Sequence, residues 1–291
     1  MSFGMFLQLA SIGLSMGMIY AFMAMGVILL VRAIGVMNFA QGDLLTAGAF
    51  ITFALGSQLK LSFPMMIVAA LIIFAVGGIL FMFAVYWPLR STSWPATIVI
   101  STLGASIVIK EVLKFIWGTI PIPVEPIISG TLEIAGAHIE KQYLIIIAVG
   151  IVVIMGVFLL FDKMYVGRAM QAAAQDKYAA ELLGIPTIIT TAATYAISMS
   201  LAGIGGYLVS PLFLVSLTLG SMQLKAFAGI VIGGFGNIKG AVVGSIIVGL
   251  IEAFSTMITT TYKDAIVFLV LIIVLVIRPQ GLFGELIDEK A

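Results

Sequence analysis

Residues 71–87 read LIIFAVGGILFMFAVYW and contain no charged side chain. Comparable apolar runs recur along the chain, for example AIVFLVLIIVLVI at 265–277. These runs are continuous and do not alternate between apolar and polar residues, so they indicate helices and not the strands of a barrel. A helix satisfies its own backbone hydrogen bonds in lipid. The runs therefore predict an all-α polytopic membrane protein.

The overall composition supports a membrane protein and excludes several functional classes. Of the 291 residues, 62% are hydrophobic and 9% are charged, whereas soluble domains are about half apolar and a quarter charged. The net charge of +1 gives no reason to expect a nucleic-acid partner. The chain has no cysteine and a single histidine, His138, and we find no P-loop and no nucleophile elbow. We therefore expect no catalytic residue, no metal and no cofactor.

We expect one transmembrane domain over residues 1–291, with about eight to ten helical segments, some of them broken. A shorter run, Ala226–Phe235, is ambiguous and fits a short or broken helix that crosses the membrane or dips into it. The predicted spans are Leu7–Val31, Val36–Leu55, Phe63–Trp87, Ala96–Trp117, Tyr143–Phe161, Ile188–Val209, Ala241–Ile258 and Ala265–Ile277.

Basic residues near span ends predict the orientation, because they favour the cytoplasm. If the polar insertion at 162–187 lies inside, Arg32 and Arg90 lie inside as well. The amino terminus is then outside. For the tail at 278–291 to lie inside, an even number of crossings must follow the insertion. The ambiguous run supplies the extra crossing.

One polar stretch, IGVMNFAQGDLLTAGA at 34–49, interrupts the apolar pattern. Its residues Asn38, Gln41, Gly42 and Asp43 include poor helix formers that can end one helix or cap the next. One interpretation is an inward-facing break that lines a substrate path, matched by Asn237 and Gly240. The other is an ordinary turn with a helix cap at the cytoplasmic headgroups.

Two further patterns suggest an inverted repeat and close helix packing. The segments at 34–50 and 235–251 both place an asparagine and a glycine before a helix that is rich in small residues, and matching breaks in two halves are typical of inverted repeats in transporters. The 31 glycines include faces such as Gly13–Gly17 and Gly240–Gly244, which predict close helix contacts.

Few charged residues fall within the predicted spans. Lys110, Glu111 and Lys114 lie in the last turns of one span, so we expect them to extend to the outer surface. Glu252 lies deeper, and we expect it to pair with a lysine. A hydrogen bond to a neighbouring helix or a place on the transport path are its alternatives, and a pathway role is open for Asp43 too.

The insertion at 162–187 predicts a short helix outside the membrane. Its segment RAMQAAAQDKYAAELL consists of strong helix formers and is followed by Gly184 and Pro186, which end a helix. An apolar stripe recurs every four residues and could enter a groove on a partner protein. A helix that lies on the membrane surface is the alternative. The stripe consists of Met170, Ala174, Tyr178 and Leu182.

Four blocks of this sequence, in this order, resemble permease subunits of ATP-binding-cassette importers for branched-chain amino acids, the LivH type. They are GLSMGMIYAFMAMGVILLVRAIGVMNFAQGD, VGRAMQAAAQDKYAAELLGI, GGFGNIKGAVVGSIIVGLIE and IRPQGLFGE. The resemblance covers nearly the whole chain. It implies that the insertion is a coupling segment that docks into a cytoplasmic ATPase subunit. The residues that carry this implied role are Gly167, Arg168, Ala169, Gln175, Asp176, Ala180, Leu183 and Gly184.

The resemblance also implies the partners. These are a second homologous permease subunit, two cytoplasmic ATP-binding subunits and an extracytoplasmic protein that delivers leucine, isoleucine or valine, all at a bacterial inner membrane. Importers of urea, short amides or other amino acids share much of the pattern, so they stay as alternatives. A passive aquaporin-like channel is a further alternative, because NFA and NIK are similar to the paired asparagines of such pores. Neither asparagine is followed by Pro-Ala, which argues against a channel.

Overall fold

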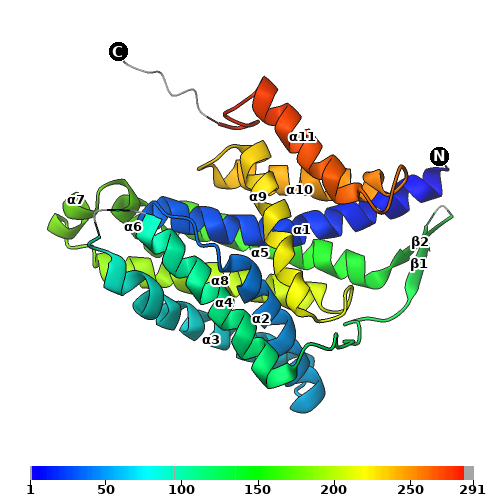
Figure 1. Ribbon diagram of the computed structural model, residues 1–291, viewed down its shortest axis with the longest axis horizontal. Helices are drawn as coiled ribbons and strands as arrows, with labels where there is room; N and C mark the ends of the chain where they lie inside the picture. Colours follow the sequence, from blue (N-terminus) through cyan, green and yellow to red (C-terminus); the bar gives the residue numbers. More distant parts are fainter. Residues whose placement is uncertain (1, 93, 95, 135, 285–291) are drawn as a thin grey trace. The chain divides into compact units, whose positions relative to one another are not determined.

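The computed structural model describes residues 2–92, 94, 96–134 and 136–284, and its regular structure is almost entirely helical (Figure 1). Within these residues, six helices are long and apolar enough to cross a membrane. The all-α polytopic fold that the sequence predicts is thereby confirmed. The six spans are α1 (Phe3–Ile34), α3 (Phe63–Phe81, continued by η2 and η3), α4 (Ala96–Trp117), α5 (Lys141–Lys163), α8 (Thr187–Val209) and α10 (Ile238–Ser255).

Shorter elements complete the described chain. The ambiguous run at 226–235 belongs to a short helix that follows a 3₁₀ turn, and the connection after α4 contains a β-hairpin in which Thr131 pairs with Glu140. Residues 285–291 of the predicted cytoplasmic tail lie outside the described residues. The shorter elements are α2 (Gln41–Phe53), η1 (Ala54–Gln58), η2 (Met82–Tyr86), η3 (Trp87–Leu89), β1 (Thr131–Ile134), β2 (Ala137–Glu140), α6 (Tyr165–Gln175), α7 (Lys177–Leu182), η4 (Leu217–Ser221), α9 (Met222–Gly233) and α11 (Lys263–Ile277).

The contacts divide the chain into two compact units, which we describe separately. The α2–α8 unit comprises Leu29–Pro126 and Val152–Ser221. The α9–α11 unit comprises Met1–Ile28, Ile127–Ile151 and Met222–Ala291.

Glycines set the helix packing of the α2–α8 unit, in which α8 packs against both α2 and α3 (Figure 1). A β-carbon on Gly48 of α2 would lie 2.9 Å from the Cα of Gly203 on α8, and one on Gly78 of α3 would lie 2.7 Å from the Cα of Ala196. Both distances are shorter than any ordinary contact, so only glycine fits. The helix backbones touch directly at these points, as small residues allow in membranes.

The α9–α11 unit is built in the same way. Helix α10 packs against α9 and α11 (Figure 1). A β-carbon on Gly229 of α9 would lie 2.7 Å from the Cα of Ser245, and one on Gly17 of α1 would lie 2.7 Å from the Cα of Ile246. The glycine faces predicted from the sequence therefore serve close helix packing.

Candidate functional site

The chain leaves helical structure between α1 and α2. Helix α1 ends at Ile34, Gly35 adopts a positive φ of 72°, and α2 begins only at Gln41. Asn38 is 2% exposed, and its Oδ1 accepts a hydrogen bond from the Ala40 N–H at 3.0 Å. The predicted second span is therefore broken between Ile34 and Gln41, and Asn38 within the break is buried.

Helix α4 indicates the depth of this break. The Phe39 N–H donates to Thr102 Oγ1 at 3.2 Å, and the Ser106 hydroxyl donates to Asp43 Oδ2. The midpoint of Ala96–Trp117 falls beside Ser106. Since α4 is a candidate span, its middle lies near the middle of a bilayer of ordinary thickness. This geometry favours a break at membrane depth over a turn among the headgroups.

Gln41 joins α2 to α8. Its Nε2 donates to the Ser198 carbonyl at 3.0 Å, and its Oε1 accepts from the Ser198 hydroxyl at 3.2 Å. The side chain is fully buried. Because both ends of the amide are engaged by α8, Gln41 holds the break in place. A direct role in a passage, as predicted, is less compatible with this arrangement than a structural one.

Asp43 lies in the first turn of α2, where the helix dipole favours a negative charge. Its side chain is 5% exposed, and Lys110 Nζ lies 3.4 Å from Asp43 Oδ1. Lys110 is 46% exposed, and it also pairs with a carboxylate from another helix, a contact that the sequence did not predict. Glu111 and Lys114 pair with each other at 3.1 Å and are exposed, as expected.

The 3₁₀ turn η4 covers Asp43. It packs against α2 and α4, and a β-carbon on its Gly220 would lie 2.8 Å from Asp43 Oδ1. Just before η4, Val215 exchanges backbone hydrogen bonds of 2.8 and 2.9 Å with Ile122, which belongs to the connection after α4. The backbone of η4 thus lies against the Asp43 carboxylate, and the residues before it are joined to that connection. Gly42 has a backbone role, since its carbonyl accepts from the Thr46 hydroxyl at 3.1 Å.

Asn237 and Gly240 form the start of α10 in the α9–α11 unit. Asn237 Oδ1 accepts from the Gly240 N–H at 3.1 Å and begins α10, while its Nδ2 donates to the Phe283 carbonyl at 3.2 Å. Asn237 thus caps α10 directly, whereas Asn38 accepts from the Ala40 N–H just before α2, which has no side-chain cap. Their place on a substrate path stays a prediction.

A buried charge cluster lies in the α9–α11 unit. Glu252 of α10 pairs with Lys225 of α9 at 2.7 Å and with Lys263 of α11 at 2.9 Å, and it accepts from the Tyr20 hydroxyl at 2.5 Å. Lys225 also lies 2.8 Å from Asp264. The predicted pairing of Glu252 with a lysine is confirmed. The sequence did not identify the partners, because they come from three other helices.

The insertion forms two helices, so the prediction of one helix is wrong. The break falls at Asp176, whose extended backbone (φ −149°, ψ 104°) and side chain cap α7 by accepting from the Ala179 N–H at 2.9 Å. Aspartate favours such a cap over a helix interior. The predicted stripe is wrong as well, because Met170 is 3% exposed whereas Tyr178 and Leu182 are 72% and 71% exposed.

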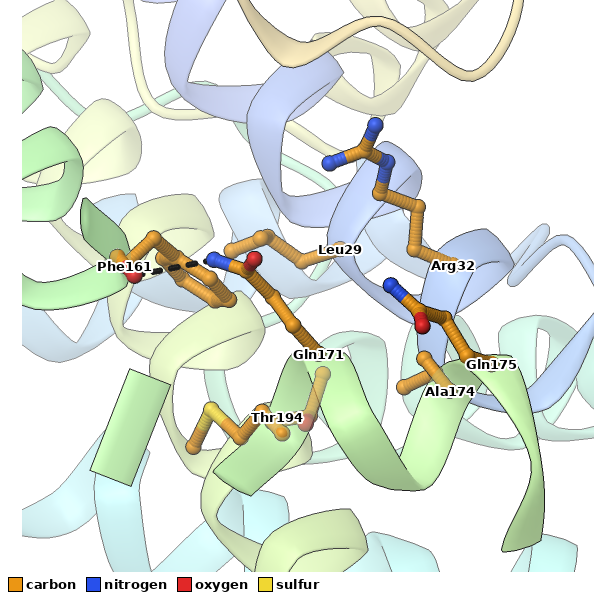
Figure 2. A pocket seen from close by; sticks show the side chains of 9 residues that line it. Leu29, Arg32, Phe161, Gln171, Ala174, Gln175 and Thr194 are labelled. Carbon is orange, nitrogen blue, oxygen red and sulfur yellow. Dashed lines mark hydrogen bonds between the residues drawn. The ribbon is translucent and has the colours of Figure 1, made fainter. Parts of the chain in front are cut away.

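Helix α6 is seated on its own unit beside a cavity of about 270 Å³. Gln171 Nε2 donates to the Phe161 carbonyl at 2.8 Å, and Figure 2 shows Gln171, Ala174 and Gln175 of α6 among the residues that line the cavity. Gly167 and Ala169 of α6 are buried as well. In contrast, α7 is largely exposed, although Ala180 is buried. Of the other predicted coupling residues, Arg168, Asp176 and Leu183 are exposed, and Gly184 ends the segment with a φ of 80°.

Comparisons with known proteins agree on one family. The family model for the branched-chain amino acid transport system permease component matches residues 9–275. The high-affinity branched-chain amino acid transport system permease protein LivH of Salmonella typhimurium is 30% identical, over 98% of this chain and 97% of the relative. The corresponding protein BraD of Pseudomonas aeruginosa is 30% identical over 98% of each chain.

More distant similarity extends to a further curated protein and to the fold of one solved structure. A probable branched-chain amino acid transport permease protein LivH of Methanocaldococcus jannaschii is 24% identical over 90% of this chain and 87% of the relative. The solved structure of PsaBC from Streptococcus pneumoniae in complex with Fab aligns with a TM-score of 0.51 at 14% identity, over 94% of this chain and 90% of that one. With spans and family in agreement, the chain belongs to the branched-chain amino acid transport permeases and is a multi-pass membrane protein.

Proposed function

We propose that this chain is the membrane-spanning permease subunit of an ATP-driven importer of leucine, isoleucine and valine in a bacterial inner membrane. The match of the family model to residues 9–275 is the observation that carries the proposal. The chain forms the translocation pathway together with a second, homologous permease subunit. Two cytoplasmic ATP-binding subunits hydrolyse ATP, and an extracytoplasmic binding protein delivers the substrate. The permease itself is not an enzyme.

The substrate path runs beside the break at Asn38–Asp43. A branched-chain amino acid combines a zwitterion with an apolar side chain, so it needs polar groups at a helix break and apolar walls around them. The burial of the break and its hydrogen bonds to the middle of α4 support this placement.

Helix α7, and not a stripe that continues from α6, is the surface that docks into the ATPase. Tyr178, Leu182 and Leu183 are 72%, 71% and 81% exposed, whereas α6 is held by its own unit. Three large apolar side chains exposed on one short helix are typical of a contact with a partner. Because the break at Asp176 separates the two helices, α6 anchors the segment and α7 presents it.

The first prediction concerns this contact. Tyr178→Ala should weaken co-purification of the ATP-binding subunits and lower uptake about 30-fold, since truncation of a central aromatic anchor costs about 2 kcal/mol or more. Tyr165→Ala is the matched control, because Tyr165 is 73% exposed at the start of α6. The control should leave both measurements close to those of the wild type. Equal losses in the two variants, or no loss in either, would contradict docking through α7.

The second prediction is the orientation, with the amino terminus outside and the carboxyl terminus inside. The chain has no cysteine, so single cysteines introduced at Glu133 and Lys177 report the two sides. In intact cells, a membrane-impermeant thiol reagent should label position 133 and leave position 177 unlabelled. Labelling at position 177 alone would show that the orientation is the opposite of the proposed one.

Uptake by reconstituted vesicles tests the proposed function. Vesicles that contain this chain, the second permease subunit and both ATP-binding subunits should accumulate leucine when the binding protein and ATP are supplied. Omission of the ATP-binding subunits should abolish accumulation. Flux that persists without ATP would identify a channel, and accumulation of urea or an amide in place of leucine would overturn the substrate assignment.

A further inference from the structure

Asp43 carries a buried carboxylate oxygen whose hydrogen-bonding capacity is not used within the described residues. Its Oδ2 accepts from the Ser106 hydroxyl, but its Oδ1 accepts no hydrogen bond there. Lys110 Nζ lies 3.4 Å from Oδ1, whereas charge-assisted bonds between nitrogen and a carboxylate are about 2.7–2.9 Å long. Buried polar atoms are normally hydrogen-bonded, so this oxygen requires an explanation.

The other buried carboxylate among the described residues provides a contrast. Glu252 accepts from two lysines and a tyrosine at 2.5–2.9 Å, which leaves little capacity for another donor. Asp43 has one distant cation, and the Lys110 side chain that supplies it is 46% exposed. At 3.4 Å the Lys110 ammonium lies farther from its carboxylate than either lysine lies from Glu252. The Asp43 side chain is fixed by Ser106 and by its place at the start of α2.

The cover over Asp43 Oδ1 is a stretch of backbone. Gly220 of η4 has no β-carbon, and a β-carbon there would lie 2.8 Å from Oδ1. The residues before η4 are joined to the connection after α4 through Val215 and Ile122. At this point the carboxylate is covered by the backbone of one short turn and not by a side chain of Gly220.

We propose that the Asp43 carboxylate receives the ammonium group of the transported amino acid, which takes the place of Lys110 when η4 moves aside. This inference rests on the proposed function and names the residue that recognises the substrate amine. An ammonium group has three N–H donors and supplies the close hydrogen bond that Lys110 does not. Asp43 is chosen over Gln41 because Gln41 is uncharged and both ends of its amide already bind Ser198.

The test uses the complete reconstituted importer with one leucine-loaded binding protein throughout, so that the selectivity of that protein is the same for all variants. Asp43→Asn should lower the kcat/KM of leucine uptake by about 10- to 100-fold, as expected for a lost hydrogen bond between charged groups. ATP hydrolysis stimulated by the binding protein should persist, because the complex is still assembled. Glu111→Gln, next to Lys110 on α4, is the control and should transport as the wild type does.

A double variant separates recognition from charge balance. Asp43→Asn with Lys110→Met removes both charges, so a carboxylate that only neutralised Lys110 would be dispensable in it. The proposal expects this variant to assemble and still to lack leucine uptake. Restored uptake would overturn the proposal, and so would unchanged uptake in Asp43→Asn alone.

Gly220→Ala provides an independent test that keeps every charge. The added methyl group crowds Asp43 Oδ1, so leucine uptake should fall about tenfold while the complex remains assembled. Normal uptake in this variant would overturn the inference. A wild-type complex that does not transport leucine would instead overturn the proposed function, whatever the behaviour of the Asp43 variants.

Discussion

Replacement of Gly78 by leucine should abolish the stable packing of α3 against α8. A β-carbon on Gly78 would lie 2.6 Å from the Tyr195 carbonyl oxygen and 2.7 Å from the Ala196 Cα. Both are backbone atoms of a helix, so no side-chain rotation relieves the clash. Overpacking usually costs about 1–3 kcal/mol, and a rigid backbone contact belongs at the upper end or beyond. We expect little folded protein in the membrane and a large fall in the thermal unfolding temperature of what remains.

The adjacent glycine is the matched control. A β-carbon on Gly77 has no atom within 4 Å apart from its own helix and chain neighbours. Gly77→Leu should therefore be tolerated, and in a helix leucine is intrinsically favoured over glycine. The two variants have the same composition and differ only in the helix face that bears the substitution. Similar abundance and thermal stability of the two would show that α3 and α8 do not touch at Gly78.

Loss of the Glu252 carboxylate should be the second large effect. Glu252→Leu leaves Lys225 and Lys263 without their shared partner, and Lys225 is only 14% exposed. Removal of one member of a buried ion pair typically costs about 3–5 kcal/mol, because the remaining charge stays desolvated. Chemical or thermal unfolding of the purified protein measures this loss.

Asp264→Asn is the control for the same cluster. The Asp264 side chain is 54% exposed, and exposed pairs contribute about 0–1 kcal/mol. The stability of the Asp264→Asn variant should stay near that of the wild type. The double variant Glu252→Leu with Lys225→Met should recover part of the stability lost by the single one, since it removes the more deeply buried of the two lysines, whose remaining partner is the exposed Asp264. No recovery would mean that Lys225 does not depend on Glu252.

Local sequence patterns predicted much of the fold. The predicted span Ala96–Trp117 has the same bounds as α4, and the run at 265–277 lies within α11. Long apolar runs specify such helices because insertion into the membrane stabilises each helix independently of its neighbours. The break before α2 was also visible, since Asn38, Gly42 and Asp43 are poor residues for a helix interior.

Contacts between distant segments could not be predicted in this way. Glu252 meets Tyr20 across 232 positions of sequence, and Asp43 meets Lys110 on another helix. No periodicity links such residues, because their pairing depends on how the helices pack. The prediction of one helix for the insertion at 162–187 was wrong for a local reason. Its strong helix formers favour one continuous helix. In the structure, the capping tendency of Asp176 divides this helix in two.

The charge cluster around Glu252 also has an electrical consequence. It contains two acidic side chains, Glu252 and Asp264, and two basic ones, Lys225 and Lys263, so its formal charge is zero. A unit charge that crosses the full membrane potential exchanges about 2.3 kcal/mol per 100 mV with the field. A neutral cluster that moves as one body exchanges almost none. A shift of this cluster during transport therefore needs nearly the same free energy in an energised and in a depolarised cell.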